Sequence, residues 1–169
     1  MFVDASFCCN CDAKEAAQDR DTARSRHGYI IRYAGCPLLC WKSQLQTVIA
    51  LSSTESEYTG LSFALRDAIP VMELLKELRK TNFPIETAQA RAHCRVFEDN
   101  SGALEMAKIQ MYRPRTKHLI VRLHHFQDYV ERQEISIHAI NTMDQPANFL
   151  TKALNEDTLQ RHRMTVLVW

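Results

Sequence analysis

The chain lacks the two simplest signals of a membrane or secreted protein. It has no apolar run of roughly 18 residues, the length that a membrane-spanning helix needs. Its first residues have neither the basic nor the apolar region of a secretory signal peptide. We therefore expect an intracellular protein that makes no contact with membranes.

The chain also lacks a second cysteine pair at zinc-finger spacing. It has 6 cysteines, of which Cys8 and Cys11 are separated by two residues. A structural zinc site normally needs four ligands, and no second pair follows. Reduced thiols are therefore the favoured interpretation, and a zinc site is the less favoured one.

Net charge is nearly absent, at +1, but it is unevenly distributed. Residues 106–127 contain no Asp or Glu, although five lysines or arginines and three histidines lie there. Two interpretations stay open: a solvated basic face, or a surface that contacts the phosphates of a nucleic acid.

Hydrophobic periodicity predicts one domain that mixes strands and helices. Strands are expected at 2–7, 28–33, 38–43, 94–98 and 135–140. Helices are expected at 53–80, 100–109 and 119–130, and from Pro146 onward, with Pro70 kinking or breaking the longest one. Residues 8–27 are expected to form a long connection. This order indicates the α/β class, with a mixed sheet and helices on its faces.

The long helix places one acid on its apolar stripe. The stripe consists of Leu61, Ala64, Leu65, Ala68, Met72, Leu75 and Leu78. Glu57 lies four residues before its first member and therefore shares its face, whereas Glu55 falls on the polar side. Because a bare buried charge is costly, Glu57 is expected to be paired or to bind a metal.

Two further acids take positions that are unusual for Asp. Asp4 lies in the middle of the first predicted strand, on the same face as Ser6. Asp99 lies where the 94–98 strand ends and a helix begins, at the edge of the sheet where functional residues gather in α/β folds. Taken alone, Asp99 is more simply interpreted as a helix cap.

Five blocks of sequence resemble the RNase H domain of copia-type (Pseudoviridae) LTR retrotransposon Pol polyproteins. They follow the order of that family, at residues 3–6, 52–58, 98–101, 115–118 and 144–152. The resemblance covers about residues 2–155, and the blocks at 52–58, 115–118 and 144–152 are together the most specific.

The resemblance implies an RNase H-like fold, a five-stranded mixed sheet in the order 3-2-1-4-5 flanked by helices. It implies a ribonuclease H that cleaves the RNA strand of RNA/DNA hybrids during reverse transcription and leaves 5′-phosphates. We expect an RNase H domain at 1–155 and a C-terminal tail at 156–169. The domain would be a monomer in isolation and act beside the reverse transcriptase domain of its polyprotein, in the cytoplasm or a virus-like particle.

The resemblance also implies a site for two Mg²⁺ ions, with Mn²⁺ as a substitute. Asp4 would bridge both ions, while Glu57 and Asp99 would also bind metal. Asn148 takes the fourth position, where the family usually has Asp, so we expect weaker binding of the second ion. Asp144 is a possible replacement ligand, although a capping role is equally compatible with its position.

Substrate contacts follow from the same resemblance. Basic residues of the 106–127 window would grip the backbone of the DNA strand, and polar residues near the acids would read the 2′-hydroxyls of the RNA. The first group is Arg113, Arg115, Lys117 and His118; the second is Ser6, Ser53, Thr54 and Asn100. Trp41 fits either the core or stacking on nucleic acid, and the core is the commoner place for a strand Trp.

Two other functions remain open. One is an RNase H-like module that binds nucleic acid but does not cleave it, which Asn148 favours and the three acids oppose. The other is a DNA nuclease of the same fold, which fits the acids but not the copia-type blocks.

Overall fold

A computed structural model describes residues 1–8, 20–33, 38–81, 92–108 and 124–167. Its centre is a five-stranded sheet in the order β3-β2-β1-β4-β5. The strands are β1 (Phe2–Ser6), β2 (Arg26–Arg32), β3 (Leu38–Leu45), β4 (Cys94–Glu98) and β5 (Ile135–Ala139). This strand order is the one that the resemblance implies.

The sheet is mixed. β1 and β2 pair antiparallel, as do β2 and β3, so the first three strands form a meander. β4 runs parallel to both β1 and β5. The parallel pairing of β1 with β4 is short: only Phe2 and Phe97 are in register. The side chain of Gln145 fills the point where these strands separate, since its Nε2 donates to the carbonyl oxygens of Val3 and Phe97 at 2.7 and 3.2 Å.

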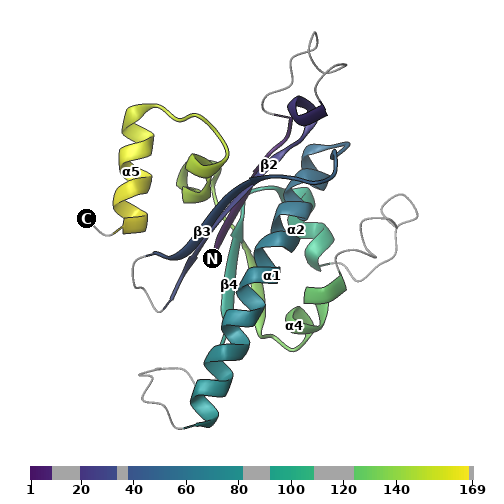
Figure 1. Cartoon of the computed structure of the whole chain (residues 1–169), viewed down its shortest axis with the longest axis vertical. Helices are drawn as coiled ribbons and strands as arrows, with labels where there is room; N and C mark the ends of the chain where they lie inside the picture. Colours follow the sequence, from purple (N-terminus) through teal and green to yellow (C-terminus); the bar gives the residue numbers. More distant parts are fainter. Residues whose placement is uncertain (9–19, 34–37, 82–91, 109–123, 168–169) are drawn as a thin grey trace.

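The helices lie on two sides of this sheet. α1 (Ser53–Lys80) contacts β1 and β2 and groups with α2 (Ser101–Lys108) and α4 (Gln127–Glu131), whereas α5 (Glu156–Leu167) lies apart from them (Figure 1). Short 3-10 helices complete the described part of the chain: η1 (Arg20–Ala23), η3 (His124–Phe126), η4 (Thr142–Asp144) and η5 (Pro146–Leu150). No helix among the described residues is long and apolar enough to cross a membrane.

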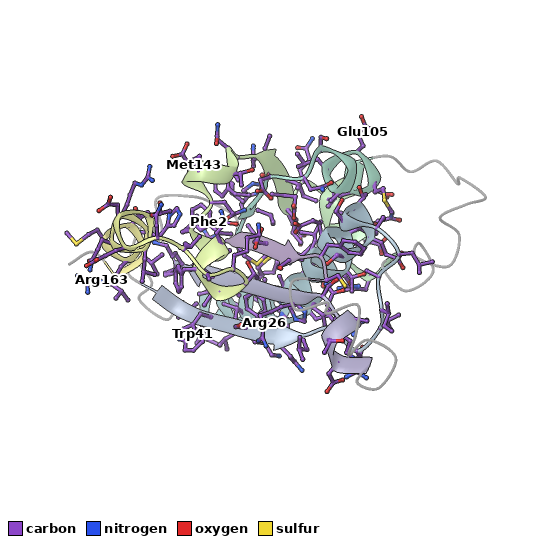
Figure 2. The ribbon with its side chains drawn as sticks, turned by 90° about the horizontal axis from the view of Figure 1, so that it is seen from above. Phe2, Arg26, Trp41, Glu105, Met143 and Arg163 are labelled. Carbon is purple, nitrogen blue, oxygen red and sulfur yellow. The ribbon has the colours of Figure 1, made fainter. Side chains whose placement is uncertain are left out.

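The core lies between the sheet and α1. Its fully buried members come from several elements and include Val3, Tyr58, Leu61, Leu65, Val96, Phe126 and Ile135. Figure 2 shows the side chains of this layered arrangement from above. The predicted apolar stripe is confirmed from Leu61 to Met72, and its last two members, Leu75 and Leu78, are partly exposed.

Several local predictions need correction. α1 continues through Pro70 as one helix, so the predicted break is absent, and Pro70 lies on the exposed side. The side chain of Ser52 caps α1, so neither Ser53 nor Thr54, the two residues that the sequence offers at the start of this helix, is the cap. The helix expected from Pro146 is the 3-10 helix η5. The segment expected to be a weakly patterned tail forms α5, which packs against η5 and buries His162 and Val166. The domain boundary at residue 155 stays a prediction.

Candidate active site

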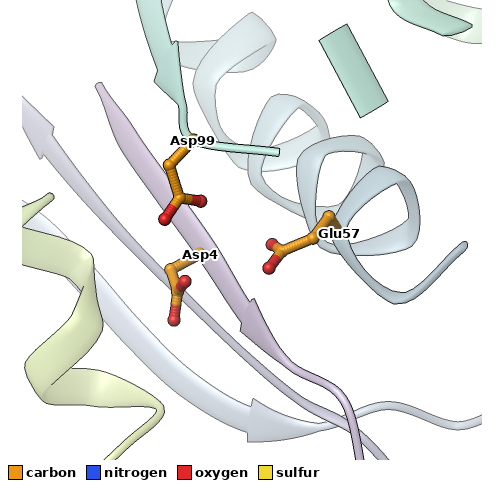
Figure 3. A group of neighbouring side chains, drawn as sticks. All are labelled: Asp4, Glu57 and Asp99. Atoms are coloured by element: carbon orange, nitrogen blue, oxygen red, sulfur yellow. The ribbon is translucent and has the colours of Figure 1, made fainter. Parts of the chain in front are cut away.

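Three acids from distant parts of the chain meet at one edge of the sheet. Asp4 comes from the middle of β1, Glu57 from the first turns of α1, and Asp99 follows the end of β4. One carboxylate oxygen of each lies within 4.8 Å of the others. Figure 3 shows the three side chains pointing toward one another. The predicted juxtaposition of these residues is therefore present.

The backbone and local sequence explain how Glu57 reaches this position. Ser52 caps α1 by accepting from the backbone N–H of Glu55 at 3.1 Å, and the carboxylate of Glu55 accepts from the N–H of Leu51 at 2.9 Å. With the start of the helix held in this way, the 3.6-residue period turns Glu57 toward the sheet. There its Oε2 accepts from the N–H of Ala5 at 2.5 Å.

Asp4 is fully buried and is held by two consecutive residues that follow η5. The Lys152 ammonium lies 2.9 Å from Asp4 Oδ1, and the Thr151 hydroxyl donates to Asp4 Oδ2. Both residues belong to the 144–152 block, but no role was assigned to them from the sequence. The signal that could have identified them is their position at the end of that block, directly after the residues that form η5.

Glu98 is a fourth acid that sequence reasoning missed. It shares the inward face of β4 with Val96, and both side chains are fully buried. Its Oε1 accepts from the N–H of Asn100 at 3.1 Å, while its Oε2 is a buried atom with no hydrogen-bond partner. Strand alternation from the apolar Val96 was the signal that could have found it.

Burial raises the pKa values of three of the clustered acids, so ionising them without a nearby cation is unfavourable. Burial, reinforced by Glu98, Asp4 and Asp99, raises the pKa of Glu57 to about 10. Burial also raises the pKa of Glu98 to about 8, and it raises the pKa of Asp4 despite the opposing charge of Lys152. For Lys152, burial is outweighed by Asp4, Glu57 and Asp99, which together raise the pKa of its ammonium. Such perturbed, mutually coupled groups are typical of functional sites.

This donor set fits a hard divalent cation. Mg²⁺ and Mn²⁺ prefer carboxylate oxygens, and the three acids converge on one point, where hydrogen bonds orient the carboxylates of Glu57 and Asp4. A nearby cation would offset the cost of keeping these carboxylates ionised in a buried place.

Asn148 also lies beside this cluster, but its oxygen already has a partner. Its Oδ1 is 3.0 Å from the Lys152 ammonium, and its Nδ2 donates to the carbonyl oxygen of Thr142 at 2.7 Å. Asp144, the alternative ligand, is exposed in η4 and is not part of the acid group.

The predicted nucleic-acid contacts divide into two sets. Ser53, Thr54 and Asn100 lie together where α1 and α2 begin: Thr54 Oγ1 is 3.5 Å from Asn100 Oδ1, which caps α2 by accepting from the N–H of Ala103 at 2.9 Å. Ser6 is buried at the end of β1. The basic set, Arg113, Arg115, Lys117 and His118, lies outside the described residues.

Trp41 is not a core residue, because 59% of its surface is exposed on β3. Cys40 and Cys94 are free thiols. Cys11, the other half of the C-x-x-C pair, lies outside the described residues.

The sheet, its helices and the acid cluster define an RNase H-like protein. A structure search supports this class: the N-terminal RNase H domain of rv2228c from Mycobacterium tuberculosis, solved as a fusion with maltose-binding protein, superposes with a TM-score of 0.57 over 97% of this chain and 94% of that chain. The two are 14% identical in sequence, so this likeness establishes the fold alone.

Sequence relatives then give the family. The chain is 31% identical over 140 residues to the retrovirus-related Pol polyprotein from transposon TNT 1-94 of Nicotiana tabacum. The aligned region covers 83% of this chain and 10% of that protein. It is 30% identical over 146 residues to the corresponding polyprotein from transposon RE1 of Arabidopsis thaliana, covering 85% of this chain and 9% of that protein. No protein-family model matches the chain.

The resemblance predicted from the sequence is thus confirmed. The chain is a homologue of retrovirus-related Pol polyproteins from copia-type transposons, with the fold of an RNase H domain. It spans about a tenth of the length of the curated relatives that it matches.

Proposed function

We propose that the chain is a ribonuclease H that hydrolyses the RNA strand of RNA/DNA hybrids with the help of divalent cations bound by Asp4, Glu57 and Asp99. The observation that carries this proposal is the convergence of these three carboxylates within 4.8 Å at the sheet edge of an RNase H-like fold. Mg²⁺ is the expected metal, with Mn²⁺ as its substitute.

The chain itself would act mainly by positioning. Hydrogen bonds from the N–H of Ala5 and from Thr151 fix the directions of the Glu57 and Asp4 carboxylates before substrate arrives, so that little reorganisation is needed during the reaction. Divalent cations bound there would activate the attacking water and stabilise the leaving oxygen. The expected products carry a 5′-phosphate on the RNA.

Substrate binding would be sequence-tolerant and strongly dependent on salt. Arg113, Arg115, Lys117 and His118 would contact the backbone of the DNA strand, which carries no base information. Ser6, Ser53, Thr54 and Asn100 would contact the RNA strand, where the 2′-hydroxyls distinguish RNA from DNA. Asn100 directly follows Asp99 in the chain and contacts Thr54 at 3.5 Å, which supports this division.

The setting of the activity follows from the relatives. Since they are Pol polyproteins, we propose that the domain, at residues 1–155, works beside a reverse transcriptase domain of the same polyprotein. Its place of action would be the cytoplasm or a virus-like particle, and the isolated domain would be a monomer.

A binding module without nuclease activity is the second candidate. It is favoured by one observation, the neutral amide of Asn148 in contact with Lys152 at the edge of the acid cluster. A DNA nuclease of the same fold is a third candidate. No contact among the described residues favours it over the other two.

One assay separates the three functions. Labelled RNA/DNA hybrid, RNA/RNA and DNA/DNA duplexes are incubated with Mg²⁺ or Mn²⁺ and with the wild-type chain, the Asp99→Asn variant, or the control Asp128→Asn. Asp128 is an exposed acid in α4, away from the cluster. We expect cleavage of the RNA strand of the hybrid by the wild type and the control and its loss in Asp99→Asn. Retained hybrid binding without cleavage under either metal would support the binding module, and cleavage of DNA/DNA would support the DNA nuclease.

A further inference from the structure

The Lys152 ammonium lies between two oxygens at the side of the acid cluster. Its Nζ is 2.9 Å from Asp4 Oδ1 and 3.0 Å from Asn148 Oδ1. Asp4 is fully buried and Asn148 is 5% exposed, whereas the Lys152 side chain is 37% exposed and reaches these two oxygens from the surface. The ammonium therefore supplies a resident positive charge on the side of Asp4 that faces Asn148.

The turn that ends in Lys152 builds this arrangement from one short segment. The N–H groups of Thr151 and Lys152 both donate to the carbonyl oxygen of Asn148, at 3.1 and 2.9 Å. This geometry directs all three side chains to one side of the turn. Asn148 Nδ2 is held by the carbonyl oxygen of Thr142, so Asn148 Oδ1 is the atom left to face the ammonium. Lys152 is positioned by backbone structure as well as by charge.

The same place is unfavourable for a second divalent cation. An ion that shared Asp4 with the first and reached toward Asn148 would need the two oxygens that Lys152 already contacts. It would also lie within a few ångströms of the ammonium, where two positive charges repel strongly. Asn148 would offer it only a neutral amide oxygen, which holds a hard cation less well than a carboxylate does.

We propose that Lys152 takes the place of a second divalent cation, so that the chain binds a single ion at Asp4, Glu57 and Asp99. This inference rests on the proposed function, because it assumes that the three acids bind a cation. The charges agree with it, since one divalent ion and one ammonium balance three ionised carboxylates. The Lys152–Asn148 pair is then the feature that sets the number of ions.

Metal binding tests this directly and needs no nuclease assay. Mn²⁺ is titrated into the purified chain, free Mn²⁺ is followed by electron paramagnetic resonance, and stoichiometry is checked by calorimetry. The variants are Asn148→Asp, the double variant Asn148→Asp/Lys152→Met, and the control Lys42→Met. Lys42 forms its ion pair with Asp67, away from the acid cluster. Circular dichroism melts confirm that each chain is folded.

We expect about one Mn²⁺ per chain for the wild type, Lys42→Met and Asn148→Asp, and about two for the double variant. The single variant is informative by itself, because it supplies a fourth carboxylate while keeping the ammonium. Two ions in the wild type or in Asn148→Asp would overturn the inference but leave the proposed function standing, and so would a folded double variant that still binds one. A wild type that binds no ion would overturn both. If the double variant fails to fold, the counts for the wild type and Asn148→Asp still decide.

Discussion

The two halves of α1 treat acidic side chains in opposite ways. In the half from residue 67 to 80, each acid forms an ion pair: Asp67 with Lys42 at 3.5 Å, Glu73 with Lys76 at 2.8 Å and Glu77 with Lys80 at 2.6 Å. In the half from 53 to 66, Glu57 is buried among other carboxylates and forms no ion pair within the described residues.

This difference separates exposed or partly exposed acids that form ion pairs from a buried acid that faces other carboxylates. Exposed ion pairs contribute little, and losing one partner leaves the other solvated. A buried carboxylate near other carboxylates is destabilising, so its presence needs a compensating gain. A bound cation would supply that gain. The following predictions test the contrast, from the largest expected effect to the smallest.

Replacing Glu57 by Gln is expected to give the largest change. Hybrid cleavage should fall roughly 100-fold or more, the loss typical when a group that stabilises charge in the transition state is removed. The thermal midpoint of the metal-free chain at neutral pH should rise, because a buried acid is gone. The matched control is Glu73→Gln in the other half of the helix, which should keep full activity. Equal losses in both variants would contradict the contrast.

The metal-free chain is expected to lose stability as pH rises. Burial, with the nearby carboxyls, raises the pKa of Glu57 from its ordinary value of 4.5 to about 10, so the folded state holds a proton that the unfolded chain has released. Stability contributed by this proton is complete below about pH 4.5 and is lost through the interval up to about pH 10, by at most about 1.4 kcal/mol per pH unit.

Denaturant unfolding between pH 7 and pH 9 measures this slope. In that window the buried His27 does not change the pH dependence of unfolding. Burial lowers its pKa to about 4, so its effect on the free energy of unfolding falls at acid pH. Saturating Mg²⁺ should flatten the profile because the cation favours the ionised carboxylates. Glu57→Gln should reduce the slope, and the part that remains up to about pH 8 comes from Glu98, whose pKa burial raises to about 8. A wild-type profile that rises with pH would show that Glu57 is ionised without metal.

Gly60 is expected to matter because it lets the first half of α1 approach the sheet. A Cβ atom at this position would lie 3.2 Å from the Cβ of His27 and 3.4 Å from the Cβ of Ala5, and Cβ atoms cannot move away without the backbone. Gly60→Val should therefore cost about 1–3 kcal/mol and weaken Mn²⁺ binding by moving Glu57 away from Asp4. The control Leu74→Val, at an exposed position of the second half, should cost less than about 0.5 kcal/mol and leave Mn²⁺ binding unchanged.

In the second half of α1, Lys76 should make a modest contribution. Its ammonium contacts Glu73 at 2.8 Å and Glu134 at 2.7 Å, and it lies 5.5 Å from the centre of the Tyr129 ring. Lys76→Met should cost about 0.5–1 kcal/mol in urea unfolding, because it removes a small network and not a single pair. Hybrid cleavage should not change.

The smallest effect is expected at Lys80. Among the described residues it pairs with Glu77 alone, at 2.6 Å, and both side chains are mostly exposed, at 71% and 63%. Lys80→Met should change the free energy of unfolding by about 0.3 kcal/mol or less, and the difference from Lys76→Met should shrink in high salt. A cost as large as that of Lys76→Met would mean that exposure does not separate the two ion pairs.

Much of the fold could be predicted from sequence because it depends on local periodicity. The 3.6-residue stripe of α1 selected Glu57 over Glu55, and strand alternation placed Asp4 on the face of Ser6. The same alternation, applied to Val96, would have identified Glu98. The order of the elements and the copia-type blocks predicted the class of fold that the strand order confirms.

Only the tertiary structure decided which side chains meet across the chain. Lys152 contacts Asp4 across 148 positions of sequence, Gln145 bridges β1 and β4, and Trp41 is exposed and not in the core. Periodicity states which way a residue faces along its own element, but contacts between elements depend on how helices and strands pack. The sequence by itself selected Asp4, Glu57 and Asp99, because their positions follow from local periodicity. Packing between elements brought the Lys152 ammonium beside Asp4.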